Sequence, residues 1–250
     1  MKIRIFDTAL EASVAGAEII AEVIKSQDKT VLGLATGSTP VPMYKDLIRR
    51  NAEKELDFTN VYSYNLDEYI GLDGTHDQSY RYFMNDNLFD HININKANTH
   101  VPCGTGADHA ADAKAYDEAI EAEGGIDVQV LGIGNNGHIG FNEPDTVFYK
   151  GTHVVDLTES TIDANKRFFA NREDVPKQAI TLGMGGIMNA KKVIMLAFGK
   201  GKAEAVRAMV NGDITPDCPA SILQLHDDVV VVGDVAALSK VTESGLYDYE

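Results

Sequence analysis

The stretch LGIGNNGHIGFNEP, residues 131–144, passes from an apolar run into a glycine-rich turn that carries a single histidine, His138. A carboxylate, Glu143, follows five residues later and is fixed by Pro144. Catalytic groups of open α/β sheets lie in loops beyond the carboxyl ends of strands, and this pattern indicates such a loop. A histidine titrates near neutral pH, and a nearby carboxylate can orient and charge it. The alternative is a surface turn whose histidine only caps a helix.

Strand and helix patterns alternate along the rest of the chain. Short β-branched runs predict the strands, and apolar residues at helical spacing predict the helices between them. The predicted strands are 2–6, 31–35, 61–65, 128–133, 193–197 and 229–232, and the predicted helices begin at Thr8 or cover 40–49, 78–88, 107–122 and 202–210. This alternation predicts a single α/β domain with a doubly wound, mainly parallel, Rossmann-like sheet flanked by helices. The run VVVV at 229–232 is apolar throughout, as a strand covered on both faces requires.

The segment from about residue 145 to residue 178 interrupts this alternation, because it mixes charged and aromatic residues. We expect it to form a β-ribbon or a lid over the site. An ordinary surface insertion is the alternative.

The composition is strongly acidic. The 250 residues include 22 Lys plus Arg against 38 Asp plus Glu, a net charge of −16. This charge repels nucleic acid and anionic membranes, so we expect neither as a partner. No apolar run is long enough to span a bilayer, and the N-terminus lacks a signal-peptide pattern. Cys103 and Cys218 are expected to be reduced, as in a cytoplasmic protein, and no Cys/His cluster has the spacing of a metal site.

A second loop, GLATGSTP at 33–40, follows a predicted strand and opens a predicted helix. Gly37, Ser38 and Thr39 offer backbone N–H groups and hydroxyls at a helix N-terminus, where the helix dipole also favours an anion. The loop matches neither a Walker loop nor a dinucleotide-binding loop. Phosphate binding and simple capping of the helix are both open from this pattern.

Two further motifs supply an acid and several cations. YNLDEY at 64–69 ends a strand with Asp67 and Glu68, of which Asp67 could act as a proton-abstracting base. Neighbours on an extended backbone point to opposite faces, so only one of the two carboxylates is expected in the site. ANKRFF at 164–169 and GKGKAEAV at 199–206 supply Arg167 and Lys202, which could bind a phosphate or remain solvated. Together these groups favour an enzyme acting on a sugar phosphate.

In this order the motifs resemble those of the glucosamine-6-phosphate deaminase (or isomerase) family over nearly the whole chain. They are TGSTP, NLDEY, GHIGFNEP, ANKRFF, GKGKA and LQLH. NLDEY with GHIGFNEP is the most specific combination, because 6-phosphogluconolactonases have a loop related to TGSTP. The resemblance implies one glucosamine-6-phosphate isomerase/6-phosphogluconolactonase-like domain over residues 1–250.

The resemblance also implies an activity. The family converts glucosamine 6-phosphate and water to fructose 6-phosphate and ammonia, with neither metal nor cofactor. We therefore expect an isomerising hydrolase of carbohydrate metabolism, acting in amino-sugar catabolism and N-acetylglucosamine utilisation in the cytoplasm.

Carried over motif by motif, the resemblance implies a role for each candidate residue. Asp67 is expected to take the C2 proton of the substrate and return it to C1. His138 is expected to move a proton at the ring oxygen, and Glu143 to hold and polarise His138. The residues expected to bind the substrate phosphate are Gly37, Ser38, Thr39, Arg167 and Lys202.

The chain departs from the family pattern at two places. Asn136, a further candidate catalytic residue, stands where many members have the aspartate of DGHIxFNEP. An amide can orient the imidazole but cannot stabilise its charged form as a full charge would, so we expect His138 to depend more on Glu143. DTVFYKGTHVV at 145–155 stands where the activated, hexameric branch has basic and serine effector ligands, and the C-terminus ends earlier. We therefore expect a monomer or small homo-oligomer, with a hyperbolic rate curve that N-acetylglucosamine 6-phosphate does not change.

Two other functions fit parts of the pattern. A 6-phosphogluconolactonase-type hydrolase needs no base at C2, so activity that survived Asp67→Asn would favour it. A non-catalytic sugar-phosphate sensor would keep the phosphate-binding residues but could lose Asp67, His138 or Glu143. All three are present.

Overall fold

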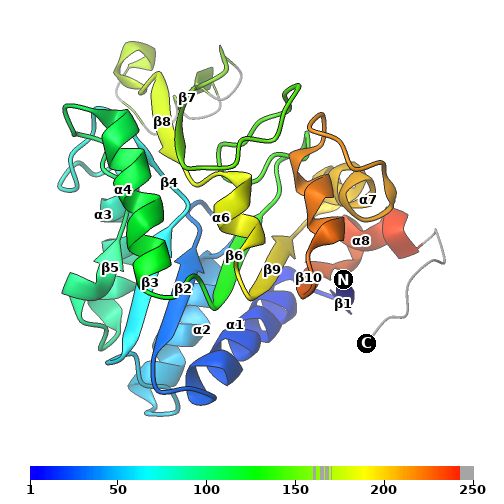
Figure 1. Ribbon diagram of the computed structural model, residues 1–250. Helices are drawn as coiled ribbons and strands as arrows, with labels where there is room; N and C mark the ends of the chain where they lie inside the picture. Colours follow the sequence, from blue (N-terminus) through cyan, green and yellow to red (C-terminus); the bar gives the residue numbers. More distant parts are fainter. Residues whose placement is uncertain (160–161, 164–165, 167–168, 170, 243–250) are drawn as a thin grey trace.

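A parallel sheet forms the centre of the molecule (Figure 1). The computed structural model describes residues 1–159, 162, 163, 166, 169 and 171–242, and Arg167 therefore lies outside the described residues. Within them, seven parallel strands have the order β1-β10-β9-β6-β2-β3-β5. The strands are β1 Lys2–Phe6, β2 Thr30–Leu34, β3 Val61–Asn65, β5 Thr99–His100, β6 Val128–Gly132, β9 Lys192–Ala197 and β10 Val229–Asp234. The predicted doubly wound α/β fold is confirmed.

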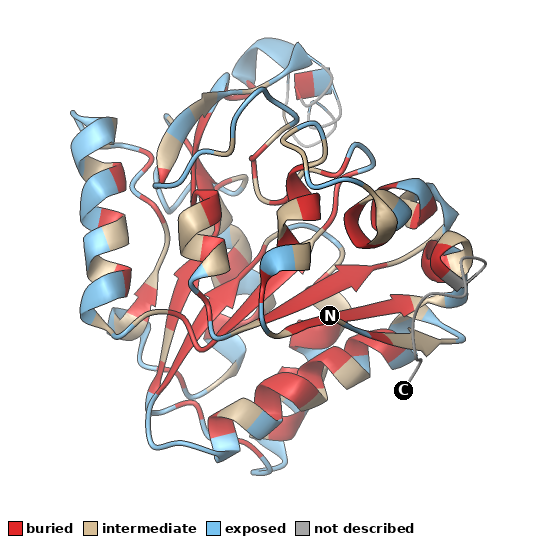
Figure 2. Cartoon of the chain, turned by 45° about the vertical axis from the view of Figure 1, so that its right-hand side comes forward, coloured by how far each residue is buried: buried red, intermediate tan, exposed pale blue. Residues whose placement is uncertain are grey.

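Helices cover both faces of this sheet. The pair α1 (Ala9–Lys25) and α2 (Val41–Ala52) packs on one face, and α4 (His109–Ala122) and α6 (Met184–Met188) lie on the other (Figure 1). The remaining α-helices of the described chain are α3 Tyr80–Asn87, α7 Ala203–Asn211 and α8 Val235–Thr242. Burial follows this layering, because the strands are buried while exposed residues lie on the outer sides of the helices (Figure 2). Among the described helices, none combines the length and apolar character that a membrane span needs.

A second, smaller sheet was only partly expected. It consists of β4 (Asp67–Tyr69), β8 (Gln178–Thr181) and β7 (His153–Asp156), and both of its strand pairs are antiparallel. Within the segment 145–178, β7 and the first residue of β8 lie in this sheet, so one strand of the predicted β-ribbon falls in the segment and its partner runs mostly beyond it. The third strand, β4, was not predicted, since it is three residues long and follows β3 almost directly. Whether the segment closes as a lid stays a prediction.

The order of the strands determines where a ligand can bind. From β2 the chain runs outward through β3 and β5, and then returns to place β6 on the other side of β2. The direction of winding therefore changes between β2 and β6. In open α/β sheets, ligands bind beyond the carboxyl ends of the strands at such a switch point.

Candidate active site

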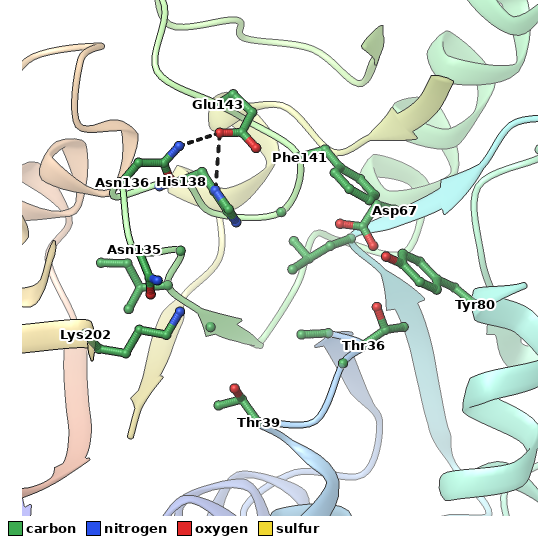
Figure 3. Close-up of a pocket in the computed structure, with 17 residues that line it drawn as sticks. Thr36, Thr39, Asp67, Tyr80, Asn135, Asn136, His138, Phe141, Glu143 and Lys202 are labelled. Carbon is green, nitrogen blue, oxygen red and sulfur yellow. Dashed lines mark hydrogen bonds and ion pairs between the residues drawn. The ribbon is translucent and has the colours of Figure 1, made fainter. Parts of the chain in front are cut away.

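A cavity of about 580 Å³ opens at this switch point. Its lining comes from the loops after β2, β3, β6 and β9 and from the first residue of α3. The lining residues are 35–37, 39, 66, 67, 80, 132–136, 138, 140, 141, 143 and 202. Asp67 and Tyr80 form one side of the cavity, and His138, Glu143 and Lys202 lie on the other (Figure 3).

The loop after β6 holds His138 against Glu143. The imidazole Nδ1 lies 3.3 Å from Glu143 Oε2, which is ion-pair distance. This nitrogen is buried and has no hydrogen-bond partner in the described chain, so Glu143 is the carboxylate placed to charge and orient the ring. The ring lies over Gly134, where a Cβ atom would be 2.3 Å from it. A side chain at position 134 would therefore displace the imidazole.

Asn136 contacts Glu143 and the main chain of His138. Its Nδ2 donates a hydrogen bond of 2.7 Å to Glu143 Oε2, and its Oδ1 accepts one of 3.2 Å from the His138 N–H. The sequence predicts that the amide orients the imidazole directly. It reaches the imidazole through the carboxylate instead, because Glu143 Oε2 is shared between the Asn136 amide and the His138 ring (Figure 3).

Asp67 is the first residue of β4 and points into the cavity from the opposite side (Figure 3). Only 6% of it is exposed. Burial, and to a smaller degree the negative charge of Glu68, raise the pKa of Asp67 to about 8. A carboxyl group with such a pKa exchanges protons near neutral pH, as a general base or acid must.

Glu68 points away from the cavity and has a structural role. Its buried carboxylate accepts hydrogen bonds from the backbone N–H groups of Tyr69 at 2.8 Å, Tyr80 at 2.9 Å and Arg81 at 2.9 Å. The last two N–H groups belong to the first turn of α3, which has no intrahelical acceptor for them. As predicted from the alternation of neighbours, only one carboxylate of the pair faces the cavity.

The far end of the cavity is suited to an anion. Gly37 (φ 86°) and Thr39 line it at the start of α2, and the first turn of this helix has no side-chain cap. Lys202 enters from a short 3-10 turn (Lys200–Lys202) that follows β9. Partial burial lowers the pKa of Lys202, and this lysine makes no ion pair with a carboxylate in the described chain. A partly buried cation without an ion-pair partner in the described chain, in the same cavity as a helix start without a side-chain cap, favours a phosphate ligand.

Two predicted phosphate ligands are not part of this geometry. Ser38 is exposed between Gly37 and Thr39 and does not line the cavity. Arg167 lies outside the described residues.

Four lining residues with polar or aromatic side chains are not among the site residues predicted from the sequence. Thr36 and Asn135 sit one residue from positions that the motifs did single out, and Phe141 lies inside GHIGFNEP. Their place in loops after strands was the available signal. No local signal marks Tyr80, because it reaches the cavity from the start of α3.

The chain is similar to several known proteins. The family model described as glucosamine-6-phosphate isomerases/6-phosphogluconolactonase matches residues 7–232. The chain is 58% identical over 224 residues to the glucosamine-6-phosphate deaminase of Clostridium perfringens (strain 13 / Type A), covering 90% of this chain and 93% of that one. It is 52% identical over 250 residues to that of Thermoanaerobacter sp. (strain X514), covering 100% and 99%. A solved structure of a monomeric glucosamine-6-phosphate deaminase superimposes with a TM-score of 0.92 at 44% identity, covering 96% of this chain and 100% of the other.

Proposed function

Because the chain belongs to the family of glucosamine-6-phosphate isomerases and 6-phosphogluconolactonases, we propose that it converts glucosamine 6-phosphate and water to fructose 6-phosphate and ammonia. The observation that carries this proposal is the presence of two separate acid–base groups in one cavity. Asp67 lies on one side, and the pair of His138 and Glu143 lies on the other. An aldose-to-ketose shift needs a base that serves two adjacent carbons, and opening a pyranose ring needs a second acid–base group.

His138 opens the ring in this proposal. The imidazole transfers a proton to the ring oxygen as the C1 hydroxyl loses one, which gives the open-chain aldehyde. Glu143, 3.3 Å from Nδ1, stabilises the charged form of the imidazole. Asn136 holds that carboxylate through its 2.7 Å hydrogen bond, and so acts as a positioning residue.

Asp67 then isomerises the open chain. Its carboxylate takes the proton from C2 and returns it to C1, while the C1 oxygen gains a proton and the amine nitrogen loses one. This leaves an alcohol at C1 and a carbon–nitrogen double bond at C2. Water adds to C2, ammonia leaves, and the product is the 2-ketone, fructose 6-phosphate. Water is consumed only in this last step, so only this step is a hydrolysis. The whole reaction is an isomerising deamination.

The phosphate of the substrate binds at the other end of the cavity. Lys202, Thr39 and the backbone at Gly37 form this part of the proposed site, with Ser38 and Arg167 as the further ligands that the family resemblance implies. Binding a phosphate distant from the reacting carbons supplies energy for holding C1 and C2 against the base.

Other expectations remain part of the proposal. We propose a monomer or small homo-oligomer without activation by N-acetylglucosamine 6-phosphate, and the monomeric relative supports the first point. We also propose one domain over residues 1–250 with a lid at about 145–178. A role in N-acetylglucosamine utilisation and a cytoplasmic location fit the proposed substrate, because a charged sugar phosphate does not cross a membrane unaided.

The test is to assay both products from glucosamine 6-phosphate in the presence of a chelator. Ammonia and fructose 6-phosphate should appear in equal amounts from the wild type, and neither should appear from Asp67→Asn. Hydrolysis of 6-phosphogluconolactone without ammonia release would replace the proposal with the lactonase. Binding of the sugar phosphate without turnover of either substrate would replace it with the sensor.

A further inference from the structure

Tyr80 lies beside Asp67 in the cavity, and its hydroxyl points toward the carboxylate (Figure 3). We infer that Tyr80 is a positioning residue, whose hydroxyl donates a hydrogen bond to Asp67 when that carboxyl group ionises and holds it toward the substrate. This inference rests on the proposed function, because it concerns the base of the proposed reaction.

The backbone at Tyr80 is fixed by the residue next to Asp67. Glu68 accepts the Tyr80 N–H at 2.9 Å, and Ser79 caps the same helix by accepting the Tyr82 N–H at 3.1 Å. Because Asp67 and Glu68 are neighbours on β4, the start of α3 and the base are held by one strand. These contacts hold the backbone of Tyr80 beside that of Asp67.

The ring of Tyr80 is fixed by aromatic neighbours. Its centroid lies 4.8 Å from that of Tyr69 and 6.1 Å from that of Phe141, and the Phe141 ring is inclined by only 4° to it. These contacts involve the ring faces and do not use the hydroxyl group. A phenylalanine at position 80 would therefore keep the packing and remove only the O–H.

The hydroxyl of Tyr80 is suited to donate. It forms hydrogen bonds with the side chains of Tyr69 and Thr36, and burial raises its pKa well above the ordinary value, so it keeps its proton. A hydroxyl has one hydrogen to donate and two lone pairs that accept. An ionised Asp67 is a stronger acceptor than the Tyr69 phenol, so the hydrogen turns to the carboxylate while Thr36 still donates to the Tyr80 oxygen.

The reaction requires Asp67 to be ionised, and a hydrogen-bond donor beside its carboxyl group favours that state. Asp67, with a pKa of about 8, is mostly protonated at neutral pH and cannot then accept the C2 proton. The other titratable groups around it are Glu68 and Tyr69 of β4, Tyr116 of α4 and His138 across the cavity. Glu68 opposes ionisation of Asp67 by its negative charge. A hydrogen bond from Tyr80 favours ionisation.

The test compares Tyr80→Phe with the wild type and with Tyr116→Phe. Tyr116 is a matched control, because its buried hydroxyl donates to the backbone oxygen of Asn65 at 2.7 Å and does not line the cavity. In Tyr80→Phe the acid limb of the kcat/KM profile should move up by about one to two pH units, the worth of one hydrogen bond to a charged group. At neutral pH kcat should fall at least about tenfold, while KM changes little. Tyr116→Phe should leave the acid limb in place.

A second measurement does not depend on turnover. Infrared difference spectra across pH follow the carboxyl stretch of Asp67, which is identified by its loss in Asp67→Asn. The pH midpoint of the Asp67 titration followed by this stretch should move up in Tyr80→Phe. This result is expected even if the wild type releases no ammonia and the proposed function fails. Thr36→Val removes the hydroxyl that donates to Tyr80 and should shift the midpoint in the same direction by a smaller amount. This variant replaces Tyr80→Phe in the test if Tyr80→Phe does not fold. An unchanged midpoint and acid limb, with or without a loss of kcat, would overturn the inference and leave Tyr80 as a packing residue.

Discussion

Replacing Asp67 with asparagine should stabilise the fold, by an amount that grows with pH. Asp67 is only 6% exposed, and its burial next to Glu68 raises its pKa from 3.8 to about 8. Between roughly pH 4 and pH 8 the folded protein therefore holds a proton that the unfolded chain has lost. Protons favour the state that binds more of them. The contribution of Asp67 to stability is thus most favourable at low pH and is lost as the pH rises through this window.

The size of the effect follows from the two pKa values. In this window the wild type should lose about 1.4 kcal/mol of unfolding free energy per pH unit through this group, to a limit of about 6 kcal/mol above pH 8. Asparagine does not ionise and has nearly the shape of a protonated aspartate. The free energy of unfolding of Asp67→Asn, minus that of the wild type, should therefore rise with this slope and level off above about pH 8.

Urea denaturation followed by circular dichroism, from about pH 5 to about pH 9, measures this difference. Asp86→Asn is the control, since it makes the same change of aspartate to asparagine at an exposed position on α3 and removes no buried carboxyl group. If the difference in unfolding free energy between Asp67→Asn and the wild type does not change with pH, the argument that burial raises the pKa of Asp67 is refuted. If Asp67→Asn is more stable than the wild type but inactive, the ionisable carboxyl group at position 67 is needed for activity and destabilises the fold.

Other substitutions test the remaining parts of the site. Glu143→Gln should lower kcat about tenfold to a hundredfold and change its pH profile, because the imidazole loses its charged partner; unchanged steady-state kinetics across pH would contradict this. Lys202→Met should raise KM about tenfold to a hundredfold with a smaller effect on kcat, and an unchanged KM would remove Lys202 from the phosphate site. Gly134→Ala should lower kcat by about a hundredfold while circular dichroism stays native, because the new Cβ would lie 2.3 Å from the imidazole of His138. Full activity of this variant would show that the ring is free to move.

The main sheet was predictable because its signals are local. Each central strand is a short apolar run, and Val229–Val232 is buried throughout, as its composition predicts. The helix predicted to begin at Thr8 has the expected capping box, in which the Thr8 and Glu11 side chains each accept the other's backbone N–H. Errors at the ends of elements are small, and β10 extends to Asp234 because this residue pairs with Phe6 of its other neighbour, β1.

The small sheet and part of the site were not predictable, because they depend on contacts between distant residues. In β4, Asp67 pairs with Thr181, which follows it by more than a hundred residues. Tyr80 faces the cavity only because Glu68 ties the start of α3 to β4. The contact of Asn136 with Glu143 likewise depends on how the loop after β6 folds back. Motif order identifies Asp67, Asn136 and Glu143, but it does not show which atoms meet.

The central claim is that one buried carboxylate, Asp67, moves a proton between two carbons of the substrate. The most direct test follows deuterium in glucosamine 6-phosphate labelled at C2. The wild type should show a primary isotope effect and place part of the label at C1 of fructose 6-phosphate, while Asp67→Asn should neither release the label nor form product. Release of the C2 label by Asp67→Asn at the wild-type rate would contradict the account, because another group would then be the base.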